Sequence, residues 1–398
     1  MRSAGASDAR AASAVAGEVA PSFAPVRDAF AKLVGGRRPG GGALVVRLRD
    51  EKVVDLVTGS ADRRGSRPWT PQTLAISFST TKGVASTVVH RLVERGVLGY
   101  DDPVARHWPA FGAGGKERVT VRHLLTHRAG LHNVQAVARR AEDLLDHLAM
   151  EERLAARTVR APTTRSAYHA ITYGWLLAGL LRQVTGMGMA DLVRTEIVEP
   201  LGIEGMHIGA PEDAREHVAE PVGAALRQVG AATRAMAPVW TRARRARIPI
   251  QALHVDGFHR LFEGPEPPIW TTEMPAVNGT FSADALSKLY AALANAGDGL
   301  LSPETTDELG RVQVRDPDLV LGLRMRWRLG YHHAFGAGRV APRAFGHYGY
   351  GGSGAWADPD LGLSVGFVTN RIGSLTTPLG DLTLFRLNRV VAECARGA

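Results

Sequence analysis

The sequence predicts a mixed α/β (α+β) fold, in which an antiparallel sheet built from both chain ends and flanked by helices carries an inserted, mostly helical region. Two β-rich runs near the N-terminus, residues 43–48 and 53–57, surround a short polar turn and predict a hairpin. Three short strand-like runs separated by glycine-rich turns, residues 344–347, 355–357 and 363–369, lie near the C-terminus. Strands at both ends with helical spacing between them indicate one shared sheet.

Helical spacing of apolar residues predicts the elements that cover this sheet and form the inserted region. The first helix is expected to end at Gly35-Gly36, and Ser282 is the expected N-cap of a later one. The stretch 211–268, rich in Ala, Arg and Pro, is expected to hold loops and one helix. Outside this stretch, the expected helices span residues 23–33, 80–94, 121–126, 141–149, 173–185, 282–296 and 379–394.

The length of 398 residues allows one large core or two closely packed subdomains. Residues 1–20 are rich in Ala, Ser and Arg without a continuous apolar segment, so a short disordered leader is expected rather than a secretory signal. Residues 21–75 together with 280–398 are expected to form an α/β subdomain, and residues 76–279 a mostly helical one. An active site is expected between the two.

The formal net charge of +9 comes almost wholly from arginine, since only five of the 48 basic residues are lysines. The charge is scattered and no nucleic-acid-binding motif accompanies it, so nucleic acid is not an expected partner. The cluster Arg242, Arg244, Arg245 and Arg247 is interpreted as a solvated basic loop, with weak contact to an anionic membrane surface as the alternative.

No run of 18 apolar residues occurs, so no transmembrane helix is expected. The only cysteine, Cys394, excludes an intramolecular disulfide. Together with the missing signal sequence, this favours a cytoplasmic protein, and association with the cell envelope stays open as the alternative.

Ser79 and Lys82 form the first candidate catalytic pair. The segment from Ser77 to Gly83 precedes an apolar-periodic run, so Ser79 is expected at a helix N-terminus. Positions i and i+3 share a helix face, which lets the lysine amine take the serine proton. The helix N-terminus also supplies N–H groups for a developing oxyanion. An N-cap serine followed by a solvated lysine explains the same spacing, so the pair alone does not decide the function.

Tyr168 and a glycine-rich segment are the next candidates. Tyr168 precedes a helix and can serve as general base or proton relay if its pKa, like that of Lys82, is lowered by about 3 units. Such neighbours titrate together, so the sequence does not assign the base to one of them. Residues 345–354 contain closely spaced glycines that bring the backbone near a substrate. A packing tyrosine and a tight turn are the structural alternatives.

In this order, the segments resemble the β-lactamase-like serine hydrolases, specifically class C β-lactamases and the related family VIII carboxylesterases. The similarity covers residues 23–391 and includes Val121-Arg122-His123-Leu124-Leu125-Thr126-His127-Arg128-Ala129-Gly130-Leu131. Tyr168-His169-Ala170, followed by Thr172-Tyr173-Gly174-Trp175, and the segment 345–352 look like the esterase branch.

The resemblance implies Ser79 as nucleophile with Lys82 and Tyr168 as the acid–base pair. It also implies an oxyanion hole made by the backbone N–H groups of Ser79 and Tyr350. No cofactor and no metal are implied.

His347-Tyr348-Gly349 occupies the place of the Lys-Thr-Gly motif of β-lactamases, which implies that His347 and Gly349 bind substrate. β-Lactamases usually carry Asn where this chain has Ala170, and His347 is not a permanent cation for a β-lactam carboxylate. Both departures favour esters.

Two other patterns suggest different chemistry. Gly362-Leu363-Ser364-Val365-Gly366 fits the G-x-S-x-G motif, but a nucleophile elbow requires a later histidine, and none follows His347. Ser364 is therefore interpreted as a strand residue. His123, His127 and His132 suggest a metal site, but no nearby carboxylate completes a ligand set.

We therefore expect a serine carboxylesterase that hydrolyses short- to medium-chain esters through an acyl-Ser79 intermediate, with a small-molecule ester as its partner. The stretch 211–268 is expected to shape the acyl pocket. One alternative is a β-lactamase or D-Ala-D-Ala carboxypeptidase-like enzyme, which shares the nucleophile. A non-catalytic binding protein of the same fold is the other.

Overall fold

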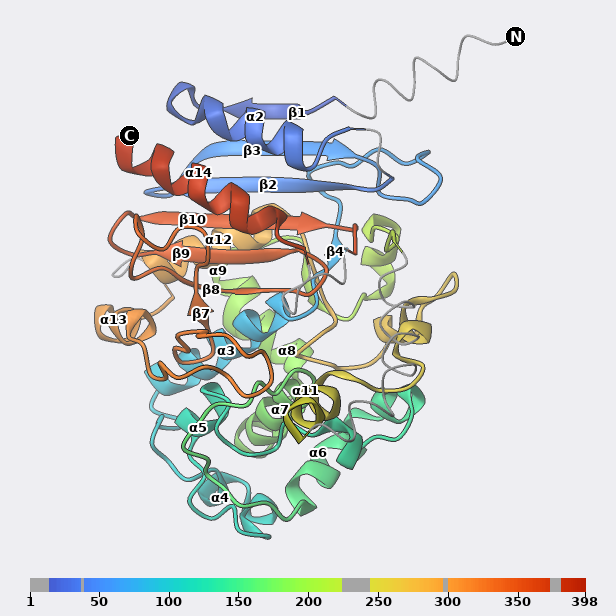
Figure 1. The fold of residues 1–398 in the computed structure, drawn as a ribbon, viewed down its shortest axis with the longest axis vertical. Coiled ribbons are helices and arrows are strands. Elements are labelled where there is room, and N and C mark those ends of the chain that lie inside the picture. Colours follow the sequence, from blue (N-terminus) through green and yellow to red (C-terminus); the bar gives the residue numbers. More distant parts are fainter. Residues whose placement is uncertain (1–13, 37–38, 224–243, 296–299, 373–380) are drawn as a thin grey trace.

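The computed structural model describes residues 14–36, 39–223, 244–295, 300–372 and 381–398, without the side chains of 244–247. Within these ranges the main element is a seven-stranded sheet in the order β1-β3-β2-β10-β9-β8-β7, in which every pair is antiparallel (Figure 1). A smaller sheet has the order β4-β6-β5. The strands are β1 (Ala16–Val19), β2 (Gly41–Leu48), β3 (Glu51–Gly59), β4 (Ala75–Ile76), β5 (Met206–Ile208), β6 (Gly279–Phe281), β7 (His332–His333), β8 (Phe345–Tyr348), β9 (Gly354–Asp358) and β10 (Leu363–Thr369).

The two ends of the chain meet in the centre of the large sheet. β2 pairs with β10 along its length, from Leu48 opposite Leu363 to Gly42 opposite Thr369. β3 lies on the other side of β2, and β9 on the other side of β10. The prediction of a single antiparallel sheet built from both termini is therefore confirmed.

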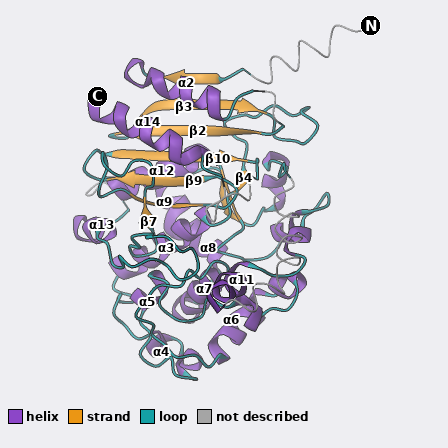
Figure 2. Cartoon of the chain, in the orientation of Figure 1, coloured by secondary structure: helices purple, strands orange, loops and turns teal. Residues whose placement is uncertain are grey.

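Helices cover both faces of the sheet, and the alternation of side chains along β2 shows why. Leu44 and Val46 belong to a buried cluster with residues of α2 and α14, which cross one face (Figures 1 and 2). Ala43 and Val45 point the other way, into the core that includes α3 and α12. Successive residues of a strand face opposite sides, so a strand covered on both faces is apolar throughout.

The helices match the expected positions closely in most places. Ser282 caps its helix by accepting a hydrogen bond from the N–H of Ala285 at 3.0 Å, as predicted. No helix in the described ranges is both long and apolar enough to cross a bilayer. The helices are α2 (Ala24–Leu33), α3 (Thr80–Glu94), α4 (Val104–His107), α5 (Val121–Leu125), α6 (His147–Ala156), α7 (Thr172–Thr185), α8 (Met189–Val193), α9 (Glu199–Leu201), α11 (Arg244–Leu253), α12 (Ala283–Ala294), α13 (Pro303–Gly310) and α14 (Thr383–Gly397).

The predicted disordered leader, residues 1–20, is too long, because part of this segment forms a strand. Residues 1–13 lie outside the described ranges, whereas Ala16–Val19 form β1, which pairs with β3 from Ala16 opposite Val57 to Val19 opposite Val54. A segment that runs along the free edge of a strand satisfies the backbone groups of both. Pairing of this kind needs no hydrophobic pattern, and the sequence therefore does not show it.

The helix expected over residues 141–149 is two elements. Residues Ala141–Leu145 form a 3-10 helix, and α6 begins at His147. Asp146 lies between them and accepts a hydrogen bond from the N–H of Ala149 at 3.0 Å. An aspartate in this position starts a new helix rather than continuing an old one. The last helix, expected to start at residue 379, begins at Thr383, and residues 373–380 lie outside the described ranges.

Ser364 is buried within β10 and donates its hydroxyl proton to the carbonyl of Ser287 in α12, at 2.9 Å. The interpretation of this serine as a strand residue is confirmed. The glycine of the same motif, Gly366, also lies against α12. A Cβ at this position would lie 2.1 Å from the carbonyl oxygen of Ala283 and 2.7 Å from the backbone nitrogen of Ser287.

Gly366→Ala is expected to lower the free energy of unfolding by about 2 kcal/mol or more, because backbone atoms of α12 cannot move aside. Urea denaturation measures this change. Gly397→Ala is the control, since a Cβ there meets nothing within 4 Å. Equal stability of the two variants would show that α12 is free to shift.

Candidate active site

Ser79 lies in a tight connection between a strand and a helix. β4 ends at Ile76, α3 begins at Thr80, and Phe78 between them has a φ of 47°. A non-glycine residue in this left-handed region costs of the order of 1 kcal/mol, a strain found mainly at functional sites. Ser79 occupies the N-cap position of α3 but its side chain makes no capping hydrogen bond. Its hydroxyl is therefore available to other partners.

The amine of Lys82 is completely buried and surrounded by oxygen atoms. Its Nζ lies 2.9 Å from the Ser79 hydroxyl, 2.7 Å from the carbonyl of Ala170 and 3.0 Å from the carbonyl of Ala276. Burial lowers the pKa of Lys82 well below its usual value. A neutral amine has two N–H donors and one lone pair. In that neutral form the two carbonyls, which only accept, can take both N–H groups and leave the lone pair for the Ser79 proton, whereas an ammonium donates to all three oxygens.

Tyr168 packs against the amine of Lys82, next to Ser79. The Nζ of Lys82 lies 4.9 Å from the centre of the Tyr168 ring. Burial raises the pKa of Tyr168, and a hydrogen bond with the Ser79 side chain partly opposes this rise. Tyr168 is therefore a neutral phenol at neutral pH. The structure brings Ser79, Lys82 and Tyr168 together from two segments almost 90 residues apart, as the sequence predicts.

Asp318 and Trp327 hold Tyr168 in place, and the sequence gives no sign of either role. Asp318 is 1% exposed and accepts hydrogen bonds from the backbone N–H of Tyr168 at 3.1 Å and the indole N–H of Trp327 at 3.1 Å. It also accepts from the N–H groups of Val320 and Leu321. The indole ring stacks on Tyr168 with 5.5 Å between ring centres. One carboxylate thus fixes both the backbone and the packing partner of Tyr168.

His347 lies behind Tyr168, with 6.3 Å between the ring centres, and is 2% exposed. Its Nδ1 lies 3.1 Å from the carbonyl of Tyr348, so Nδ1 carries the proton. Its buried Nε2 has no partner among the described residues. Burial, with His332 and Lys82 nearby, lowers the pKa of His347 well below its usual value. The ring is therefore uncharged at neutral pH.

The turn between β8 and β9 packs directly on the connection that carries Ser79. A Cβ at Gly349 would lie 2.1 Å from the carbonyl oxygen of Ser77, so only glycine permits this approach. The hydroxyl of Thr80 donates to the carbonyl of Ser353 at 3.0 Å. Among the hydrogen bonds of the described residues, none uses the backbone N–H of Ser79 or of Tyr350. Both groups are free to bind a substrate oxygen.

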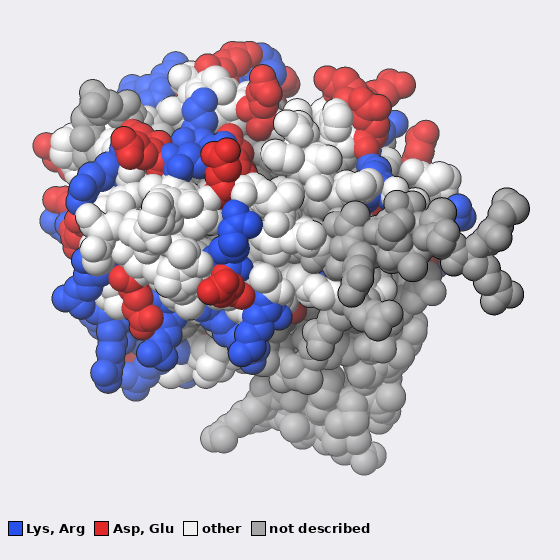
Figure 3. All heavy atoms as spheres, turned by 90° about the horizontal axis from the view of Figure 1, so that it is seen from above, with Lys and Arg blue, Asp and Glu red and all other residues white. Residues whose placement is uncertain are grey.

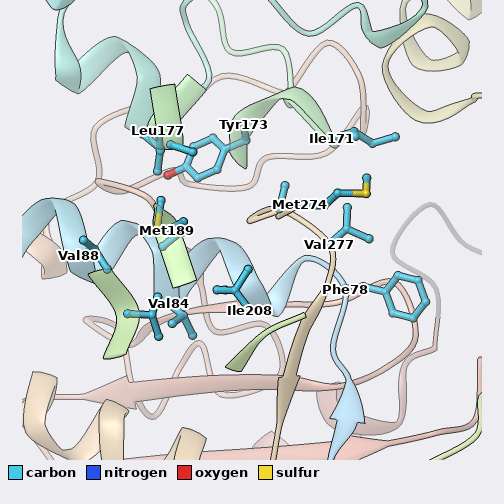
Figure 4. Packing of buried hydrophobic residues seen from close by; sticks show 14 of the residues in the cluster. Phe78, Val84, Val88, Ile171, Tyr173, Leu177, Met189, Ile208, Met274 and Val277 are labelled. Atoms are coloured by element: carbon cyan, nitrogen blue, oxygen red, sulfur yellow. The ribbon is translucent and has the colours of Figure 1, made fainter. Parts of the chain in front are cut away.

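Apolar side chains gather beside Ser79. Phe78 stacks on Phe262, which belongs to the irregular stretch 211–268, with 5.4 Å between ring centres. Figure 4 shows Ile171, Met274 and Val277 in the same buried cluster as Phe78. Residues 224–243 of that stretch lie outside the described ranges.

The other polar residues singled out in the sequence make structural contacts, and His127 makes them beside the candidate site, with its ring centre 4.9 Å from that of Tyr168. His123 belongs to a capping box with Thr120 at the start of α5. His127 is buried and its Nδ1 accepts the N–H of His169 at 3.2 Å. No group of three or more potential metal ligands occurs in the described part of the chain. Arg242 lies outside it, and of Arg244, Arg245 and Arg247 only the backbone, in α11, is described.

Comparison with known proteins agrees with this geometry. The family model for Beta-lactamase matches residues 26–384. The chain belongs to the beta-lactamase family. It is 42% identical over 393 residues to the esterase/beta-lactamase LipL of Mycobacterium tuberculosis, which covers 96% of this chain and 90% of LipL. The predicted family and the β-lactamase-like hydrolase fold are therefore confirmed.

Two solved structures of the beta-lactamase type share the fold along nearly the whole chain. A family VIII carboxylesterase superimposes with a TM-score of 0.81 at 31% identity, covering 96% of this chain and all of that one (100%). A penicillin-binding protein homologue from Caulobacter crescentus gives the same TM-score of 0.81, identity of 31% and coverage of 96% and 100%. Beta-lactamase-family relatives of this chain therefore include proteins named as esterases and as penicillin-binding proteins.

Asp318→Asn is expected to lower the free energy of unfolding by about 2 kcal/mol. The amide oxygen can still accept the backbone N–H groups, but the amide nitrogen then faces the indole N–H of Trp327, and two buried donors oppose each other. Urea denaturation of single and double variants tests this reason. In a Trp327→Phe background the indole donor is gone, and the same substitution should cost much less. An equal loss of unfolding free energy in both backgrounds would show that the opposed donors are not the cause.

Proposed function

We propose that the chain is a serine carboxylesterase that hydrolyses short- to medium-chain esters through an acyl-Ser79 intermediate. The observation that carries the proposal is the arrangement around Lys82, whose buried amine has two carbonyl acceptors and one hydroxyl within 3.0 Å. This arrangement suits a neutral amine that accepts a proton from Ser79. It thereby supplies the activated nucleophile that acyl transfer needs.

Acylation begins when Lys82 takes the Ser79 proton while the serine oxygen attacks the ester carbonyl. The free N–H groups of Ser79 and Tyr350 are proposed to bind the oxyanion that develops. When the intermediate collapses, the bond to the alcohol oxygen breaks and that oxygen needs a proton. Tyr168, a neutral phenol beside Ser79, gives its proton to the leaving alcohol and regains one from the Lys82 ammonium.

Deacylation reverses these roles with water in place of the alcohol. Lys82, neutral again, takes a proton from water through Tyr168, and the resulting hydroxide attacks the acyl-Ser79 carbonyl. The same N–H groups bind the second oxyanion. Collapse releases the acid and returns a proton to Ser79, so each cycle consumes one ester and one water.

Three features support a neutral ester rather than a β-lactam as substrate. Ala170 has no side-chain amide to bind an acylamino group. His347 is uncharged and buried, so it provides no cation for a carboxylate. The apolar side chains of Phe78 and Phe262 suit an acyl chain, because burial of each CH₂ group contributes about 0.8 kcal/mol. The name of the solved family VIII carboxylesterase points the same way, whereas the name of LipL, esterase/beta-lactamase, covers both activities.

Ser79→Ala is expected to lower kcat/KM for p-nitrophenyl butyrate by about 10³-fold or more, because the nucleophile is lost. Ser364→Ala is the matched control: it removes a buried hydroxyl that bonds to Ser287 in α12 and to none of the candidate catalytic groups, and it should keep the wild-type rate. Wild-type protein should label with a fluorophosphonate at Ser79 and turn over nitrocefin far more slowly than the ester. Equal rates for wild type and Ser79→Ala would refute the proposal, and faster nitrocefin turnover would favour a β-lactamase.

The pH dependence of kcat/KM is expected to show one acid limb and a plateau. Protonation of Lys82 removes its lone pair, so activity is lost as the pH falls through the lowered pKa of Lys82 and is constant above it. Because the pKa of Tyr168 is raised, its ionisation should produce no alkaline limb near neutrality.

Tyr168→Phe should lower kcat for the same ester by about 100-fold, because the proton relay is lost, and should leave the acid limb at the same pH. The measurement is a pH profile of wild type and variant. Disappearance of the acid limb in Tyr168→Phe would assign the general base to Tyr168 instead of Lys82.

A further inference from the structure

A second concave site lies between α14, the segment just before β7 and the turn that follows β7. Its volume is about 700 Å³, within the range of small-molecule sites. Ser79, Lys82 and Tyr168 are not part of its lining. Arg324, Arg326, Arg339 and Arg389 line it, so arginines reach it from three separate segments.

The charges of this cleft do not balance. Glu393 is its only acidic lining residue, and it pairs with Arg389 on the next turn of α14, at 2.9 Å. Arg324, Arg326 and Arg339 are exposed and have no carboxylate partner within the described residues. On the face shown in Figure 3, basic and acidic side chains are largely interspersed. The cleft itself holds three guanidinium groups that have no carboxylate partner in the described part of the chain.

The backbone around the cleft is held in unusual conformations. Arg326 has a φ of 50°, although its neighbours Met325 and Trp327 are fixed in the core at 2% and 0% exposure. Such strain persists where the surrounding structure imposes it, commonly at ligand sites. In the turn after β7, the backbone N–H groups of Gly338 and Arg339 donate to no acceptor in the described part of the chain. These two N–H groups are therefore available to a ligand in the cleft.

Buried groups next to the cleft experience the unbalanced charge. Arg328 is 1% exposed, and burial together with the charge of Arg326 lowers its pKa to about 10. Burial, Arg328 and Arg326 likewise lower the pKa of His333, a lining residue, to about 4. Asp358 opposes the effect of Arg326 on Arg328, whose pKa is lowered nevertheless. A bound anion would offset the positive charge further.

We propose that this cleft binds a small anion through its phosphoryl group. The planar guanidinium fork matches phosphoryl oxygens in two-point contact. A phosphoryl group offers more oxygens than a carboxylate does, so it can bind arginines from several segments at once. Phe335 and Val340 also line the cleft and suit an apolar part of the ligand. The phosphoryl group can belong to a soluble phosphate ester or to a phospholipid headgroup.

Calorimetric titration of the full-length protein with pyrophosphate at low salt tests the proposal. We expect saturable binding that Arg326→Gln and Arg339→Gln each weaken by about tenfold, the loss of one charge-assisted contact. The matched control is Arg118→Gln, which removes an exposed arginine outside the cleft and should bind like wild type. Thermal unfolding of each variant shows whether it is folded.

A second arm distinguishes the sources of the phosphoryl group. Phosphatidylcholine vesicles with and without phosphatidylglycerol are sedimented with wild type and the same variants. Binding of pyrophosphate without binding of vesicles identifies a soluble ligand. Vesicle binding that needs phosphatidylglycerol and Arg326 identifies a lipid headgroup. Absence of both, or equal binding by wild type and the Arg326 and Arg339 variants, overturns the proposal.

Discussion

The site depends on one constraint, which is that an amine with an ordinary pKa above 10 is kept inside the protein without a counter-charge. Burial of a charged ammonium costs several kcal/mol, so the pKa of Lys82 is lowered well below its usual value. Its two N–H groups still need acceptors, and the carbonyls of Ala170 and Ala276 provide them. Desolvation thus favours the neutral amine, and the two backbone oxygens hold it within 2.9 Å of the Ser79 hydroxyl.

The fold explains why these oxygens lie where they do. Ala170 precedes α7 and Ala276 precedes β6, so each belongs to a chain segment that packs against α3 from a different side. The left-handed turn at Phe78 lets α3 begin directly after β4, and the glycine-rich turn that contains Gly349 then closes over this start. A different sequence in any of these segments must keep the same backbone path, because backbone atoms make the contacts with Lys82 and with the start of α3.

This reliance on backbone atoms limits what a sequence can predict. The spacing of Ser79 and Lys82 and the apolar period of α3 were sufficient to predict their shared face, because helical geometry is local. Tyr168 could be placed in the site only through the resemblance of the whole ordered pattern. The two carbonyls have no side-chain signature. Asp318 has no pattern either, since its role depends on a turn that brings it beside Tyr168 from 150 residues away.

The electrostatic state of the site also bears on the choice of substrate. Burial disfavours the ionised form of Lys82, of Tyr168 and of His347, and it leaves Tyr168 and His347 uncharged at neutral pH. A substrate carboxylate would lose its hydration without meeting a cation, at a cost of several kcal/mol. A neutral ester meets no such cost and gains from contact with the apolar side chains. The unpaired arginines lie in a separate cleft, whose lining does not include Ser79, Lys82 or Tyr168.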